Sequence, residues 1–222
     1  MEKQLKVFEK LLEQFKQDSG IQGVLLTGSV ARGVASSVSD LDVIVLCDRD
    51  QFVNQTVDDV VVEIHYHTYE TMMERLETRP MAVYFYLFAK IAYDNGKLQE
   101  IIDHAWEKYH SYVTPYKEKH GIFYWLSATK IKLTYALERE DLTLLSYYTS
   151  TNTWKFLEGM WAVNNKAMPP AGLTYYMWSR LEEVPSKDWF ERIMVDSIRE
   201  RGKAMLEMLD WMLPRLEENS KS

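Results

Sequence analysis

Three carboxylates in the first third of the sequence have the types and the spacing to hold a divalent metal ion. Asp40 and Asp42 stand two residues apart at the start of the apolar run LDVIVL, and Glu63 interrupts a second apolar run, VVVEI. Residues i and i+2 of a strand share a face, so the two aspartates would point the same way and repel each other. Carboxylate oxygens are the ligands that Mg²⁺ prefers, and the cation would offset this repulsion. The pattern predicts a metal site formed by Asp40, Asp42 and Glu63.

A glycine–serine pair precedes the aspartates. Gly28 and Ser29 follow the apolar run GVLL and open a segment rich in glycine and serine. Backbone N–H groups and a hydroxyl at such a turn can contact a phosphate, and glycine lets the ligand approach the backbone closely. Two metal ions about 4 Å apart can activate an attacking hydroxyl and stabilise a leaving pyrophosphate. The combination predicts a site for a polyphosphate and its metal ions.

Each of these residues also has a simpler interpretation. Asp40 alone fits a turn, Asp42 a solvated strand start, and Glu63 an exposed edge. His65 and His67 share the face of Glu63, and a Glu-x-His-x-His run is compatible with zinc. A zinc site would explain neither the glycine–serine pair nor the aspartates, so we expect the two histidines to line the cleft beyond Glu63.

The elements that position these residues follow from the periodicity of apolar side chains. Helical spacing predicts a helix over 2–18, and short apolar runs predict strands over 22–27, 41–46 and 59–68, the second of them buried on both faces. Residues 28–39 read as a loop with room for one helical turn. A helix over 70–89, interrupted or restarted at Pro80, leads to a short edge strand over 90–93.

The character of the sequence changes after Lys97, where no further strand is indicated. Helical patterns follow one another up to the C-terminal region, at 97–111, 119–139, 142–164, 173–182 and 186–218. We therefore predict an α+β protein with a small mixed sheet followed by a helical bundle. The predicted domains are residues 1–110 and residues 111–222.

Composition narrows the possible partners. The chain has 222 residues and a formal net charge of −7, which disfavours nucleic acid as a partner and favours small or cationic partners. Its one cysteine, Cys47, lies in an apolar run and is expected to be a buried thiol, as in a reducing cytoplasm. The N-terminal segment lacks the apolar stretch of a signal peptide, and no segment has the length of a membrane span.

The ordered set of motifs resembles the nucleotidyltransferase superfamily typified by DNA polymerase beta. The resemblance is carried by Gly28-Ser29, the spacer with Ala31-Arg32-Gly33, the run Ser39-Asp40-Leu41-Asp42, and Glu63. It covers residues 22–68 closely and the rest of the first half loosely. It implies Mg²⁺-dependent transfer of a nucleoside monophosphate from a nucleoside triphosphate, AMP from ATP in the first instance.

The resemblance also implies roles for single residues. Asp40, Asp42 and Glu63 would be the catalytic and metal-binding carboxylates, in a two-metal site. Gly28 and Ser29 would contact the triphosphate, with Ser39 beside them. Lys130, in the otherwise apolar stretch WLSATKIKL, is a further candidate for the triphosphate, and a lysine that extends from a packed helix to solvent is the simpler alternative.

The sequence, with a helical half after the catalytic half, is similar in architecture to the aminoglycoside and lincosamide nucleotidyltransferases. This resemblance implies a small-molecule acceptor and a role in antibiotic resistance. In some relatives a glutamate from this half is the general base, and Glu138, Glu140 and Glu158 are available. One alternative is a toxin–antitoxin type of nucleotidyltransferase that modifies a protein partner. Another is a catalytically inactive nucleotide-binding protein. A homodimer is compatible with the aromatic residues of the second half.

Overall fold

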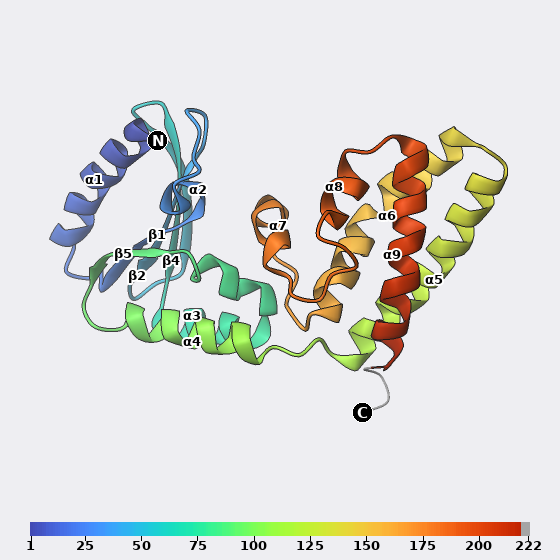
Figure 1. The fold of residues 1–222 in the computed structure, drawn as a ribbon. Helices are drawn as coiled ribbons and strands as arrows, with labels where there is room; N and C mark the ends of the chain where they lie inside the picture. Colours follow the sequence, from blue (N-terminus) through green and yellow to red (C-terminus); the bar gives the residue numbers. More distant parts are fainter. Residues whose placement is uncertain (219–222) are drawn as a thin grey trace. The chain divides into compact units, whose positions relative to one another are not determined.

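The structure is a computed structural model that describes residues 1–218. The chain forms two compact units, Met1–Ser111 and Tyr112–Ser222 (Figure 1). The first unit holds a five-stranded sheet and its helices, and the described part of the second is helical. The α+β fold class is thereby confirmed. Whether each unit is an independent domain, as predicted for 1–110 and 111–222, stays a prediction.

The sheet is mixed, and its strand order is β3-β4-β2-β1-β5. The three inner strands are β1 (Gly23–Leu26), β2 (Leu41–Leu46) and β4 (Val60–His67). β2 pairs with β4 in parallel and with β1 in antiparallel orientation. Every residue of β2 except Asp42 is buried, as expected for a central strand covered on both faces.

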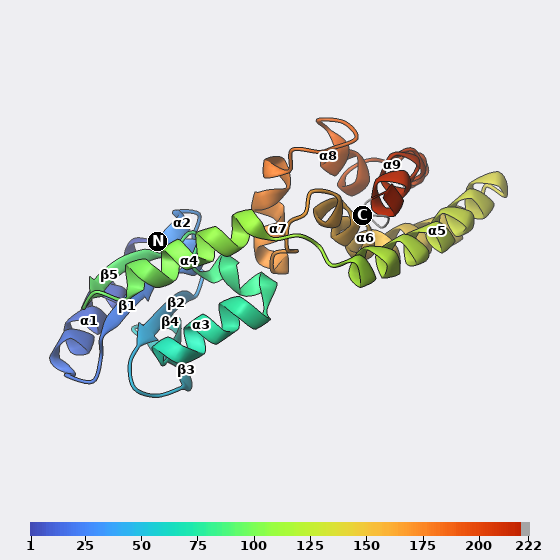
Figure 2. The ribbon, with the colours of Figure 1, turned by 90° about the horizontal axis from the view of Figure 1, so that it is seen from below.

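Helix α1 (Glu2–Gln17) covers one face of this sheet (Figure 1). Its apolar stripe packs on side chains that alternate along the strands, with Phe8 and Leu11 in one buried cluster with Val43 and Ile64. On the first unit's other side, α3 (Tyr69–Thr78) and α4 (Leu98–Ser111) pack together, and His104 of α4 meets Glu77 of α3 at 2.8 Å (Figure 2).

Strand β3 (Gln51–Val57) was not predicted from the sequence. It forms a hairpin with β4 and is an edge strand whose side chains are mostly exposed, so it lacks the apolar pattern that marks an inner strand. Asp58 and Asp59 form the turn with φ angles of 49° and 55°, as a two-residue hairpin with two left-handed positions requires.

The segment around Pro80 agrees with the sequence pattern. Helix α3 ends before Arg79, and Pro80 starts a separate 3-10 helix, η1 (Pro80–Phe85). Strand β5 (Lys90–Asp94) follows at the sheet edge beside β1. Oδ1 of Asp94 then accepts hydrogen bonds from three successive N–H groups, at 2.9, 3.0 and 3.1 Å, which begins α4.

The second unit is built on three long helices that pack on one another, α5 (Tyr116–Glu138), α6 (Leu142–Val163) and α9 (Ile198–Glu218). The predicted helix over 173–182 is α7 (Ala171–Met177) followed by the 3-10 turn η2 (Trp178–Arg180). Of the helices in residues 1–218, none has both the length and the apolar composition that a bilayer span requires.

The prediction of one continuous helix over 186–218 is wrong. The structure has α8 (Trp189–Met194) and then α9, separated by three residues. Ser197 ends the break, because its Oγ accepts a hydrogen bond from the N–H of Glu200 at 3.4 Å. Ser197-x-x-Glu200 has the spacing of a capping box, a helix-start signal inside an apolar pattern that otherwise reads as continuous.

Candidate functional site

Asp42 and Glu63 lie on the sheet face opposite α1. Leu41 and Val43 on either side of Asp42 belong to the cluster under α1, as do Val62 and Ile64 on either side of Glu63. Because side chains alternate along a strand, the two carboxylates point to the other face. The parallel register of β2 and β4 pairs Asp42 directly with Glu63.

Asp40 completes a group of three carboxylates. It is an exposed residue immediately before β2, and Asp42 and Glu63 are half-buried. One oxygen from each lies within 4.8 Å of one from each of the others. Among the residues that the structure describes, this is the one cluster of histidine, cysteine or acidic side chains that could hold a metal ion.

The three carboxylates raise one another's electrostatic cost. The pKa of Asp42 is raised to about 6, through burial first and then through the neighbouring Asp40 and Glu63, with Arg32 acting in the opposite direction. Three mutually repelling carboxylates with oxygen donors fit a hard divalent cation such as Mg²⁺.

Gly28 fits against Asp42 so closely that no side chain can replace its hydrogen. A Cβ at this position would lie 1.8 Å from Oδ2 of Asp42, and the residue has a left-handed φ of 67°. The neighbouring backbone joins the same two strands, since the N–H of Thr27 donates to the carbonyl of Asp42 at 3.0 Å. Glycine is therefore required where β1 meets the start of β2.

Ser29 is the next residue, in the short helix α2 (Gly28–Arg32). Its Oγ is buried and has no hydrogen-bond partner among the described residues. Buried hydroxyls are almost always paired with protein, water or ligand. The orphaned hydroxyl adjoins Gly28 and hence the carboxylates, so it is suited to bind a polar ligand there.

Ser39 uses its side chain within its own loop. Its Oγ accepts a hydrogen bond from the N–H of Ser36 at 2.9 Å and lies 3.2 Å from Oγ of Ser36. Its backbone carbonyl accepts from Nε2 of Gln4 at 3.0 Å. These contacts fix the chain immediately before Asp40. A contact between Ser39 and a triphosphate stays a prediction.

Gln4 is a residue of the site that the sequence analysis missed. It is buried in α1, and its Nε2 donates to the carbonyls of Ser36 and Ser39 at 2.9 and 3.0 Å. The available signal was its position, because Gln4 continues the helical stripe of Phe8 and Leu11 toward the N-terminus. A polar residue in a buried stripe needs a hydrogen-bond partner, here the loop that carries Asp40.

Glu63 is the first of three polar residues along β4, and Nδ2 of Asn54 donates to its Oε1 at 3.1 Å. His65, two residues on, has its ring 4.8 Å from that of Phe52. The hydrogen-bond partner of Glu63 comes from β3, the strand that was not predicted.

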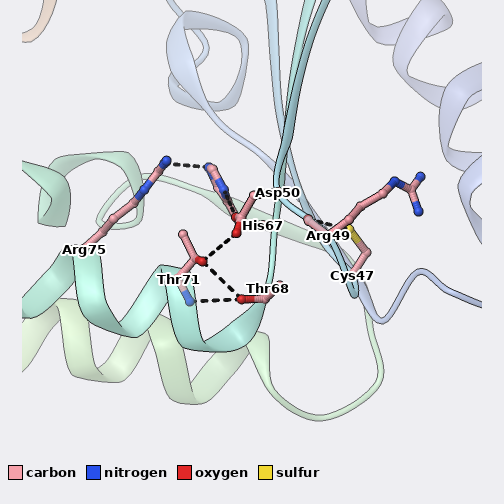
Figure 3. Close-up of polar contacts among 7 residues, drawn as sticks. All are labelled: Cys47, Arg49, Asp50, His67, Thr68, Thr71 and Arg75. Carbon is pink, nitrogen blue, oxygen red and sulfur yellow. Dashed lines mark hydrogen bonds and ion pairs between the residues drawn. The ribbon is translucent and has the colours of Figure 1, made fainter.

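His67 is held on both ring nitrogens, which argues against a zinc site. Its Nδ1 lies 2.8 Å from Oδ1 of Asp50, and its Nε2 lies 2.6 Å from Nη1 of Arg75 (Figure 3). Arginine only donates, so Nε2 accepts and Nδ1 carries the proton that Asp50 accepts. Burial lowers the pKa of His67, which keeps the ring neutral. Oδ2 of Asp50 also accepts from Thr71 of α3 at 2.8 Å.

The candidate residues of the second half belong to the helical unit. Lys130 forms an ion pair with Asp210 of α9, and its contact with a triphosphate stays a prediction. Glu140 pairs with Arg199 at 3.1 Å, Glu158 pairs with Lys155, and Glu138 is exposed. These pairs account for the charges of three of the four residues within the unit itself.

Comparison with known proteins agrees with this geometry. The family model described as nucleotidyltransferase domain matches residues 8–120, just over half of the chain and including the carboxylates and the glycine–serine turn. The chain therefore belongs to the nucleotidyltransferase domain family. No curated protein matches the sequence.

Among solved structures, the chain is similar to a nucleotidyltransferase-like protein from Exiguobacterium sibiricum 255-15. The sequence identity is 11%, the TM-score is 0.48, and the match covers 96% of this chain and 75% of the other.

Proposed function

We propose that this protein transfers a nucleoside monophosphate, AMP from ATP in the first instance, to a hydroxyl group of a small molecule. Membership of the family supports nucleotide transfer in general. The observation that carries the specific proposal is the convergence of three carboxylate oxygens within 4.8 Å beside the turn at Gly28 and Ser29.

Asp40, Asp42 and Glu63 would hold Mg²⁺, as one ion or as a pair. When bound, the cation offsets the negative charge of the carboxylates and of the triphosphate. The raised pKa of Asp42 and the crowding of Gly28 against its carboxylate support this assignment. Ser29 would donate its buried hydroxyl to a phosphate oxygen, which would satisfy a group that is unpaired among the described residues.

The proposed reaction is a displacement at the α-phosphorus. A bond forms between the acceptor oxygen and that phosphorus, and the bond from the phosphorus to the bridging oxygen of the β-phosphate breaks. Pyrophosphate leaves with the electron pair, and the hydroxyl proton passes to a base.

An aminoglycoside-like antibiotic is the acceptor class to test first. The net charge of −7 supports a cationic acceptor, because carboxylates can pair with its ammonium groups. The resemblance to the antibiotic-modifying enzymes that we expected from the helical second half of the sequence is the other reason for this choice. We further propose a cytoplasmic setting, in keeping with a single buried free thiol at Cys47.

The test is transfer of label from α-labelled nucleoside triphosphates with Mg²⁺, using a panel of antibiotics and other hydroxyl-bearing small molecules. We expect label on an acceptor with the wild-type protein and none with Asp42→Asn, whose fold should be intact by circular dichroism. Label on a protein would favour the toxin–antitoxin type of activity. Triphosphate binding without any transfer would favour an inactive binding protein.

A further inference from the structure

Strand β4 and the edge strand β3 place two aromatic side chains beside Glu63. The antiparallel register sets Phe52 of β3 directly opposite His65 of β4. Ile64 and Val53, which are their neighbours along the strands, pack in and against the cluster under α1. Since side chains alternate along a strand, Phe52 and His65 project from the opposite face of the sheet, the face that carries Glu63.

The two rings lie against each other, and we name Phe52 and His65 the aromatic pair. Their ring centres are 4.8 Å apart, and the ring planes are inclined by 37°. Phe52 is 54% exposed, and His65 is half-buried. Aromatic rings at this separation attract each other, so each ring helps to hold the other in place. The pair offers a flat apolar surface that a ligand can reach.

The imidazole of His65 adds polar groups to this surface. Neither of its ring nitrogens is buried, and neither has a hydrogen-bond partner among residues 1–218. His67, the next residue on the same face, differs because both of its ring nitrogens are engaged by Asp50 and Arg75 (Figure 3). His65 therefore has one donor and one acceptor for a ligand when its ring is neutral.

The aromatic pair and the turn at Gly28 lie on opposite sides of the carboxylates. Across the sheet the strands run in the order β3, β4, β2, β1, so the pair is on β3 and β4, and Gly28 follows β1. Along the strands, Gly28 meets Asp42 at the start of β2, whereas His65 lies two residues beyond Glu63. The carboxylates thus lie between the turn and the pair in both directions.

The proposed reaction gives this placement a consequence. In a phosphoryl transfer of this kind the attacking and leaving oxygens lie roughly in line through the phosphorus. With the pyrophosphate held at Gly28 and Ser29, the attacking hydroxyl arrives from the side of the aromatic pair. The pair is about 7 Å along β4 from Glu63, so an acceptor in contact with it can extend a hydroxyl to the metal ions.

We infer that Phe52 and His65 bind the acceptor and select compounds that carry a ring with an apolar face. This inference rests on the proposed function, because it concerns the acceptor of that reaction. The ring of Phe52 would cover the C–H groups of the acceptor ring, and His65 would exchange a hydrogen bond with a polar group at its edge. A sugar ring has both features, whereas a flexible chain alcohol has no such face and should be a poor acceptor.

Steady-state transfer of label from ATP to kanamycin A tests the role of Phe52, and the best-labelled compound of the panel replaces kanamycin A if that is not an acceptor. Phe52→Ala should raise the KM for the acceptor about tenfold or more, because the covered ring surface is lost. The KM for ATP should stay within about twofold, since the pair does not contact the nucleotide. Phe52→Tyr keeps the ring face and should retain the wild-type KM for the acceptor.

Ile91→Ala is the matched control. Ile91 is an exposed apolar residue of β5, the edge strand at the other side of the same sheet, and its substitution should leave both KM values unchanged. His65→Phe keeps an aromatic ring and removes the hydrogen-bonding nitrogens, so it should raise the KM for the acceptor about fivefold. Melting temperatures close to that of the wild type would show that the variants fold.

The outcomes separate this inference from the proposed function. Transfer by the wild type with an acceptor KM that Phe52→Ala leaves unchanged would overturn the inference alone. Weaker calorimetric binding of a non-hydrolysable ATP analogue with Mg²⁺ to Phe52→Ala would also overturn it, because the pair would then contact the nucleobase. If the wild type labels no hydroxyl-bearing small molecule, the proposed function and the inference both fail.

Discussion

The Cβ that an alanine would add at Gly28 would lie 1.8 Å from Oδ2 of Asp42. An alanine there would force the carboxylate of Asp42 to turn away from its place beside Asp40 and Glu63. The position of Asp42, a candidate metal ligand, therefore depends on glycine at position 28. The sequence indicated that glycine allowed a close approach, but it did not reveal that the approaching group was Asp42 itself.

Gly28→Ala should lower kcat/KM by about 100-fold or more, because a displacement on the order of 1 Å at a reacting centre can have an effect of that size. Gly33→Ala is the matched control, since Gly33 also has a positive φ, 76°, but has nothing within 4 Å of its Cβ position. Both variants should lose about 1–2 kcal/mol of stability through backbone strain, and Gly28→Ala should lose more because its Cβ also meets the side chain of Asp42. Transfer assays and denaturant unfolding of both variants measure the two effects, and equal activity would contradict the account.

Ser29→Ala should weaken the binding of a triphosphate without lowering the stability of the fold. Removing a buried hydroxyl without a partner among the described residues should leave the free energy of unfolding unchanged or raise it. Losing a hydrogen bond to a phosphate should weaken triphosphate binding roughly tenfold, which corresponds to about 1.4 kcal/mol. Calorimetric titration of a non-hydrolysable triphosphate measures the change, and a loss of stability with unaltered affinity would count against the assigned role.

At the scale of elements, the predictability of a segment depended on its burial. Strand β2 was predicted at its observed bounds because burial on both faces leaves a continuous apolar run. The exposed edge strand β3 carries no such signal, although it supplies Asn54 to Glu63. The break before α9 was not predicted, because apolar residues lie on both sides of Ser197 and the helical pattern reads as continuous.

The N-cap serine at the start of α9 gives a stability prediction. Ser197→Ala removes the oxygen that accepts from the N–H of Glu200 and should lower the free energy of unfolding by about 1 kcal/mol. Ser197→Asp keeps an acceptor at the N-cap and should retain the wild-type stability. Urea unfolding of the three proteins checks this, and an alanine variant as stable as the wild type would show that the contact contributes nothing.

The network of His67 joins β4 to α3 and makes stability depend on pH. The folded pKa of His67 lies below its ordinary value, chiefly through burial; the hydrogen bond with Asp50 acts against burial, and the charge of Arg75 adds to the lowering. The unfolded state therefore binds more protons below about pH 6.5, and stability falls as the pH drops from there through the folded pKa. Denaturant unfolding from pH 8 to pH 5 should show this loss in the wild type.

The same titration of His67→Gln should show a smaller loss of stability over that range, because glutamine keeps hydrogen-bonding groups and does not titrate. Asp50 contributes at lower pH, since its pKa is lowered chiefly by its hydrogen bond with His67. An identical pH profile in the two proteins would mean that another group controls the acid response.

At the scale of the whole molecule, sequence reasoning was sufficient for the fold class and for the family. The ordered motifs between residues 28 and 63 lie on adjacent strands or directly beside their ends, so their convergence follows from strand pairing. Partners that lie far apart in the chain could not be predicted, such as Asp210 for Lys130 or Gln4 for the loop before Asp40. These contacts depend on how complete helices pack, which local periodicity does not encode.

The central claim is that the carboxylates of Asp40, Asp42 and Glu63 hold divalent cations while Gly28 and Ser29 receive the triphosphate. A crystal structure with Mg²⁺ and a non-hydrolysable nucleoside triphosphate tests it most directly. We predict cations bound by oxygens of all three residues, with phosphate oxygens against the turn and hydrogen-bonded to Ser29. A triphosphate bound elsewhere, or a cation that Glu63 does not contact, would contradict the account.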